Sequence, residues 1–146
     1  MDESSEKVNK VEENLKKMLR EADPIFTRVD NIAKEFLDGK TKETTYYYNT
    51  LEVLSGCYTH LVVGWKQLEA QKQNAEVRQY MVIKQECTTS GEKFVSASAE
   101  REASASVRQL RQVRNIFEGY VLACAESIRT CKKRIGGYEE GRQVEL

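Results

Sequence analysis

The basic side chains in the last third of the chain are the clearest candidates for binding a ligand. Arg101, Arg108 and Arg111 recur at spacings that place them near one face of a helix, with Arg114 beside them. The planar guanidinium group suits phosphate and carboxylate oxygens. A row of this kind indicates either a solvated helix face or a phosphate-binding stripe, and the sequence supports both interpretations equally.

A second basic group lies just before a pair of glycines. Its members are Arg129, Lys132, Lys133 and Arg134. We expect Gly136 and Gly137 to end the last helix, so these cations would lie in its final turn and offset the negative end of the helix dipole. We favour that structural role over ligand binding.

Residues for other kinds of chemistry are sparse. The single histidine is His60, and no two cysteines form a CxxC pair. The cysteines are Cys57, Cys87, Cys124 and Cys131. A zinc site or a Cys–His nucleophile therefore lacks ligands, and no glycine-rich nucleotide loop occurs. We expect a protein that is not an enzyme and that needs no metal or cofactor.

Composition indicates one all-α domain. The 146 residues include one proline, and 32% are charged, which is typical of long helices. The net charge is zero, but residues 88–137 carry nine bases and five acids, so a local basic face remains available. No apolar run is long enough to span a membrane and no signal peptide is found, so we expect a reduced, cytoplasmic protein without a membrane partner.

A long helix is predicted from Thr44 to Cys87. Its apolar residues recur in steps of three and four. They are Tyr47, Leu51, Leu54, Tyr58, Leu61, Trp65 and Leu68. No charge occurs between Val53 and Trp65, so the first half of this helix is predicted to serve packing or assembly and the polar second half to serve binding.

Small and aromatic residues of this helix add two expectations. Gly56 and Gly64 lie on roughly one face and would permit close approach of another backbone. Tyr46, Tyr47 and Tyr48 cannot all face inward, so at least one is exposed. An exposed tyrosine could stack on bases or line a subunit interface, and we favour the interface.

The N-terminal segment, residues 1–39, carries one apolar heptad register. Its members are Val8, Val11, Leu15, Met18, Ala22, Ile25, Val29, Ile32 and Phe36. We expect Ser4 or Ser5 to cap the helix and Gly39 to end it. Asp23-Pro24 predicts either two helices or one kinked helix. These heptads would form a third layer of the fold or pair with another subunit.

The C-terminal half is predicted to fold back on the long helix. Residues 88–105 form a turn followed by a small-residue segment, which is either a short helix or a flexible linker. The last helix covers residues 106–135, and residues 138–146 form a frayed acidic tail. The apolar stripe of the last helix consists of Leu110, Val113, Phe117, Tyr120, Cys124, Ile128, Cys131 and Ile135. The expected fold is a long antiparallel helical hairpin with an additional N-terminal helix or kinked helix pair.

One segment resembles a known family. Leu68-Glu69-Ala70-Gln71-Lys72, followed by Ala75, Arg78 and Tyr80, is similar to a segment of the phage recombination-mediator family typified by UvsY. The resemblance continues through Gly91, Phe94, a serine/alanine stretch and a last helix that ends in basic residues. It covers about residues 51–135.

The resemblance implies a ring-forming homo-oligomer that binds single-stranded DNA. Such a protein displaces single-strand-binding protein and loads a RecA-like recombinase during DNA recombination and repair, in the host cytoplasm if it is phage-encoded. Several basic stripes on one ring would raise avidity. The proposed phosphate contacts are Lys72, Arg78, Lys84, Arg101, Arg108 and Arg111.

Two other functions remain open. A helical coiled-coil scaffolding or assembly protein without nucleic-acid binding would use the N-terminal heptads to join its partners. A small helical subunit of a larger nucleoprotein machine would bind its partner and remain monomeric alone.

Overall fold

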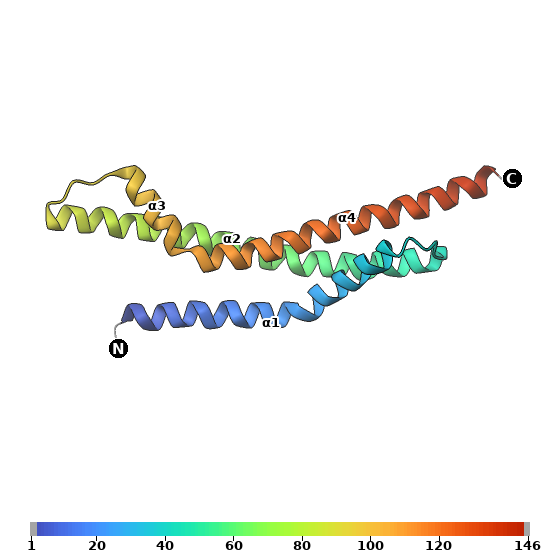
Figure 1. Ribbon diagram of the computed structural model, residues 1–146, viewed down its shortest axis with the longest axis horizontal. Helices are drawn as coiled ribbons and strands as arrows, with labels where there is room; N and C mark the ends of the chain where they lie inside the picture. The colour runs from blue at the N-terminus through green and yellow to red at the C-terminus, as the bar shows by residue number, and fades with distance from the viewer. Residues whose placement is uncertain (1–2, 145–146) are drawn as a thin grey trace.

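A computed structural model describes the backbone of residues 3–144 and the side chains of that span, apart from those of residues 4–5, 7–9 and 138–144. Within residues 3–144 the chain forms four helices and no strand, which confirms the all-α class. The helices are α1 (Glu3–Leu37), α2 (Thr44–Ser90), α3 (Ser96–Ser106) and α4 (Arg108–Val144). Together they form an elongated rod (Figure 1).

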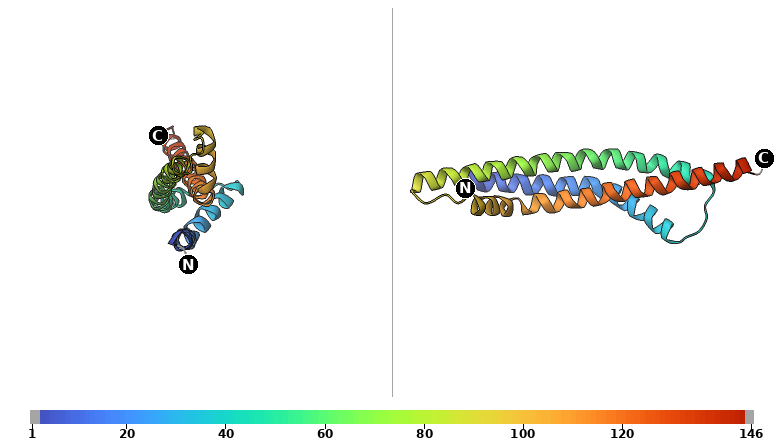
Figure 2. Two further views of the ribbon diagram at one scale, coloured as in Figure 1. Left: turned by 90° about the vertical axis from the view of Figure 1, so that its left-hand side faces the viewer. Right: turned by 90° about the horizontal axis from the view of Figure 1, so that it is seen from above.

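The predicted antiparallel hairpin is formed by α2 and α4. The two helices run side by side in opposite directions in both views of the long axis (Figures 1 and 2). The side chains of Leu54, Leu61 and Leu68 from α2 are fully buried, as are those of Cys124 and Cys131 from α4. Each set repeats every seven residues, which is the spacing of two long helices packed along a seam.

The buried face of α2 differs from the predicted face at every second position. Tyr58 was expected inside, but its side chain is 38% exposed, and Leu51 and Trp65 are only half-buried. The smaller residues Thr50, Cys57 and Gly64 are buried instead. Small side chains on the seam let α4 approach closely, so the bulky residues move to the flanks.

Helix α1 packs against the hairpin within the same chain. The ring of Phe26 stacks on Tyr120 with centroids 4.2 Å apart and meets the edge of Phe117 at 5.4 Å. Leu15 and Val29 are buried in the same core, although Val11 is 44% exposed. The N-terminal heptads therefore form a third layer, while the side chain of Val8 lies outside the described residues.

Pro24 lies inside α1, and the helix changes direction part-way along its length (Figure 1). Of the two interpretations of Asp23-Pro24, the kinked helix is the one that the structure adopts, because proline lacks the N–H that would bond to the preceding turn. Ser4 and Ser5 were expected to cap this helix, but both already lie within it.

Two glycines end helices as left-handed caps. Gly39, with φ 66°, follows α1 as predicted, and Gly91, with φ 76°, follows α2. Helix α2 therefore extends to Ser90 instead of ending at Cys87. Glycine adopts this conformation without the steric penalty that a Cβ would bring.

The small-residue segment is an ordered helix, α3, and the linker interpretation is wrong. Ala99 and Ala103 are 1% and 3% exposed, and α3 packs against α2. The methyl side chains of alanine allow this close packing, and alanine also favours the helix.

Gly136 and Gly137 were expected to end α4, but the helix continues through both glycines to Val144. Neither has a positive φ. Glycine weakens a helix without forbidding it, and good helix formers such as Glu139 and Glu140 follow. The predicted acidic tail is thus helical to residue 144.

Candidate nucleic-acid interface

An ion-pair network joins α2 to α4 and involves one of the predicted phosphate contacts. The guanidinium group of Arg114 bonds to the carboxylate of Glu69 and lies 3.0 Å from that of Glu118. Lys72 Nζ lies 3.5 Å from Glu69 Oε1, and its side chain is only 17% exposed. Lys72 is therefore a structural cation at the hairpin seam.

Glu69 is the centre of this network. Burial alone would raise the pKa of its carboxyl group, but the hydrogen bond from Arg114 and the positive charges of Lys72 and Arg114 outweigh burial and hold the pKa below its ordinary value. The carboxylate thus stays ionised and keeps both cations engaged at neutral pH.

Arg111, another predicted phosphate contact, holds three helices together. Its Nη2 lies 3.4 Å from Glu76 Oε1 of α2 and donates a 3.0 Å hydrogen bond to the carbonyl oxygen of Ser104 in α3. Because protein acceptors already occupy this side chain, Arg111 is less suited to phosphate than a free arginine.

The other four predicted contacts are exposed, and no acidic side chain among the described residues pairs with them. These are Arg78, Lys84, Arg101 and Arg108. Arg101 and Arg108 are seven residues apart, one in α3 and one at the start of α4. Lys84 Nζ lies 5.9 Å from the ring centroid of Phe94.

The six predicted residues do not form one continuous stripe. Arg78 and Lys84 are six residues apart in α2, which turns them about 120° from each other around the helix. Arg78 and Lys84 therefore point to different sides of α2, whereas Arg101 lies on α3 and Arg108 at the start of α4.

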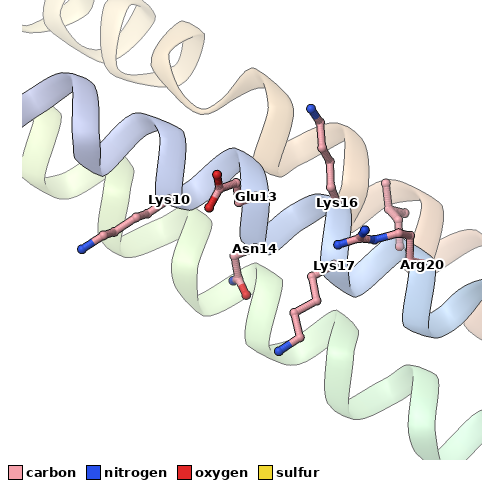
Figure 3. A pocket seen from close by; sticks show the side chains of 7 residues that line it. Lys10, Glu13, Asn14, Lys16, Lys17 and Arg20 are labelled. Carbon is pink, nitrogen blue, oxygen red and sulfur yellow. The ribbon is translucent and has the colours of Figure 1, made fainter.

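A basic cluster on α1 was missed by the sequence reasoning. Its cations are Lys10, Lys16, Lys17 and Arg20, which line a depression of about 780 Å³ together with Asn14, Glu13 and Leu19. Figure 3 shows these side chains fanning out from α1, with Lys16 and Lys17 on opposite sides. Residues 1–39 carry more acids than bases, so the net charge of this segment gave no sign of the cluster. The basic residues nevertheless recur on the face opposite the apolar stripe, which is a signal that could have found them.

The α1 cluster lies at the same level of the rod as the arginines of α3 and α4. Helices α1 and α4 run in the same direction (Figure 1), and Phe26 contacts Phe117. Lys17 precedes Phe26 by nine residues, and Arg108 precedes Phe117 by nine. One end of the molecule thus carries exposed cations from α1, α3 and α4.

The basic group of residues 129–134 has a different setting from the predicted one. Because α4 continues to Val144, these cations do not occupy its last turn, and the helix-dipole explanation is wrong. Arg129 pairs with Glu126, whereas Lys132, Lys133 and Arg134 are exposed.

The three consecutive tyrosines divide as expected. Tyr47 is buried, Tyr46 donates a hydrogen bond to Glu35, and Tyr48 is 49% exposed. Burial, followed by the hydrogen bond to Glu35, raises the pKa of Tyr46 to about 12. These tyrosines lie at the start of α2, far along the helix from Lys84.

The part of the chain that the structure describes contains no group of three histidine, cysteine or acidic residues that could hold a metal. No helix among the same residues is long and apolar enough to cross a membrane. Comparisons with protein-family models, with curated proteins and with solved structures yield no match.

Proposed function

We propose that this chain is a non-enzymatic, oligomeric protein that binds single-stranded DNA and acts as a recombination mediator. The observation that supports the proposal best is the presence of exposed cations on α1, α3 and α4 at one level of the rod. Phosphate contacts of this kind provide affinity that does not depend on base sequence.

The proposal places the contacts on cations that the fold leaves accessible. They are Lys84, Arg101 and Arg108, together with Lys10, Lys16 and Arg20 of α1. A neutral subunit with a small basic surface would bind weakly alone, and repeated copies of that surface in a homo-oligomer would multiply the contacts along one strand. In this proposal Lys72 and Arg111 hold the hairpin together and do not contact phosphate.

Fluorescence anisotropy with a labelled single-stranded oligonucleotide tests DNA binding. The double variant Arg101→Gln/Arg108→Gln is expected to weaken binding about tenfold at low salt. Because two phosphate contacts are lost, the slope of log K against log salt should also fall by about 1.4.

The double variant Lys132→Gln/Lys133→Gln is a matched control, since it removes the same charge from exposed positions farther along α4. Its affinity should stay within about twofold of the parent affinity. Equal weakening by both variants would indicate bulk electrostatics instead of a site. Absence of binding by the parent at about 50 mM salt and micromolar protein would reject the function.

The mediator step needs a separate assay. DNA-dependent ATP hydrolysis by a RecA-like recombinase is followed on single strands coated with single-strand-binding protein, with and without this chain. The proposal expects this chain to shorten the lag, and an unchanged lag with intact DNA binding would limit the function to strand binding.

A second candidate is a helical scaffolding or assembly protein that does not bind nucleic acid. It is favoured by exposed apolar side chains on α2, among them Val63, Val77 and Met81, which are 53%, 63% and 56% exposed. The N-terminal heptads no longer support it, because they pack within the chain. Assembly without any binding to single strands would select this function.

A further inference from the structure

A groove lies on the side of the hairpin next to α1. Met18 and Ala22 of α1, together with Gly56 and Val63 of α2, border a hollow of about 740 Å³ in which Phe117 also takes part. A second hollow of about 540 Å³ shares Gly56 with the first and reaches Pro24 at the bend of α1. The groove therefore follows α2 for about four helical turns.

The groove exists because α1 leans on α4 more than on α2. The aromatic contacts of Phe26 are with Phe117 and Tyr120, both in α4. Helix α1 makes fewer contacts with α2 than with α4. The face of α2 next to α1, which contains Gly56, Thr59 and Val63, therefore remains exposed.

No contact within the described part of the chain requires glycine at position 56. A Cβ at Gly56 would meet no atom within 4 Å, so neither packing nor a positive φ requires glycine there. Glycine weakens a helix interior relative to alanine. Gly64, by contrast, is required because a Cβ there would lie 2.6 Å from Phe117 Cε1. The space beside Gly56, which lines the groove, is therefore open to a side chain from outside the chain.

Val63, two helical turns from Gly56, provides an apolar side chain that could fill the open space beside a glycine. Its side chain is 53% exposed on the same side of α2 as Gly56. If two α2 helices lie antiparallel about an axis between Thr59 and His60, Val63 of each copy faces Gly56 of the other. A twofold contact requires this reciprocal match, in which residue i meets residue j and j meets i.

Charge and exposed area are consistent with a second copy as the occupant. Among the described residues, Glu21 is the one charged side chain that lines the main hollow, and the second hollow adds one cation, Arg28, and one acid, Glu52. Two such faces therefore meet with little like-charge repulsion. The chain exposes 10560 Å², whereas a compact monomer of 16.8 kDa exposes about 7,700 Å². The excess is well above the roughly 800 Å² that each partner buries in a standard interface.

We propose that a second copy of this chain occupies the groove, with the two α2 helices antiparallel and Val63 of each copy packed on Gly56 of the other. This contact rests on one part of the proposed function, namely that the chain forms a homo-oligomer. It does not depend on DNA binding.

Sedimentation equilibrium without DNA tests the interface. The parent is expected to self-associate at micromolar concentration, and Val63→Glu should raise the dissociation constant at least about tenfold because a carboxylate would be buried unpaired. Leu122→Glu is the matched control. Leu122 is 59% exposed on α4 and lines neither hollow, so the dissociation constant of this variant should stay within about twofold of the parent value.

Disulfide trapping tests the register independently of any folding defect. In a Cys87→Ser background, oxidation of a mixture of Gly56→Cys and Val63→Cys chains should link the two variants about tenfold faster than either variant links to itself. Identical positions would lie about 10 Å apart along the helices, too far for a disulfide.

Three results would overturn the proposal: a monomeric parent at about 100 µM, equal effects of Val63→Glu and Leu122→Glu, or a mixture that cross-links no faster than its components. Anisotropy with single-stranded DNA is measured separately. Loss of DNA binding by a chain that still self-associates would reject the proposed function and leave the interface intact.

Discussion

At the residue scale, Gly64 determines how closely the two long helices approach. It is buried in α2, and the ring of Phe117 from α4 fills the space where a side chain would lie. Phe117 is itself 2% exposed and held by the edge of Phe26. Because the ring already occupies this space, a side chain at position 64 would push the two helices apart or displace the ring.

We predict that Gly64→Ala destabilises the protein by about 1–2 kcal/mol, since the overpacking cost exceeds the gain in helix propensity. Urea unfolding followed by circular dichroism measures the change. Gly119→Ala is the control, because a Cβ there meets nothing within 4 Å. That variant should be neutral or slightly more stable, and equal destabilisation by both would contradict this account of Gly64.

The buried cysteines are a second residue-scale feature. Cys57, Cys124 and Cys131 are free thiols inside the hairpin, and Cys124 is fully buried. Burial, with a smaller contribution from the nearby Cys57, raises the pKa of Cys124 from an ordinary value of 9.0 to about 11. These thiols act as small apolar core residues and are poorly reactive at neutral pH.

The raised pKa of Cys124 predicts a loss of stability at alkaline pH. The unfolded thiol ionises near pH 9 while the folded one stays protonated, so the stabilising contribution is complete below pH 9 and is lost as pH rises towards 11. The free energy of unfolding should fall by about 2 kcal/mol more for the parent than for Cys124→Ala over this range. Tyr46 and Tyr120 titrate in both proteins and cancel in the difference. Parallel pH profiles would contradict the prediction.

At the scale of elements, α3 joins the two arms of the hairpin through small side chains. Its buried residues Ala99 and Ala103 allow the helix to pack directly on α2. Phe94, in the loop before it, meets the ring of Tyr80 at 5.7 Å. Arg111 then ties the end of α3 to Glu76, so the position of Arg101 and Arg108 depends on this packing.

Ala103→Leu is expected to destabilise the protein by about 1–3 kcal/mol, because the larger side chain cannot fit between α3 and α2. Ala97→Leu changes an exposed position of the same helix and should have a much smaller effect. Thermal unfolding of both variants provides the measurement. If DNA binding exists, it should weaken in Ala103→Leu under conditions where the protein remains folded, since Arg101 would be displaced.

At the scale of the whole molecule, the chain is a rod with a large surface for its mass. A long hairpin buries its seam efficiently but leaves the outer faces of both helices open (Figure 2). The cations lie towards the end that contains α3, whereas the groove, which few charged side chains line, follows the first half of α2. The two surfaces adjoin on α1, where Lys17 and Arg20 line the basic depression and Met18 and Glu21 line the groove. Substitutions on α2 are therefore the ones that alter assembly without removing a cation of the basic depression.

Association through the groove predicts a melting temperature that depends on protein concentration. A partner that binds only the folded chain stabilises it by mass action, so the melting temperature of the parent should rise by about 5 °C over a hundredfold increase in concentration. Val63→Glu should show no such rise. Scanning calorimetry at several concentrations makes the comparison, and a parent that melts at one temperature throughout would contradict it.

The sequence alone determined the helical class, the antiparallel hairpin and the helix end at Gly39. These features depend on local properties: the spacing of apolar residues, the absence of proline from α2 and α4 and the conformational freedom of glycine. It also identified exposed cations such as Arg101 and Arg108, because charged residues opposite an apolar stripe face water wherever the helix packs.

Only the tertiary structure decided which of two neighbouring positions is buried and which cations are engaged by acids. Gly64 replaces Trp65 on the seam because Phe117, fifty-three residues later, needs the space. Lys72 shares Glu69 within α2, and Arg114 and Arg111 reach Glu69 and Glu76 across the hairpin, so acids already engage two of the six predicted phosphate contacts. Such contacts join residues far apart in the chain, and helical periodicity carries no information about what the opposite helix presents.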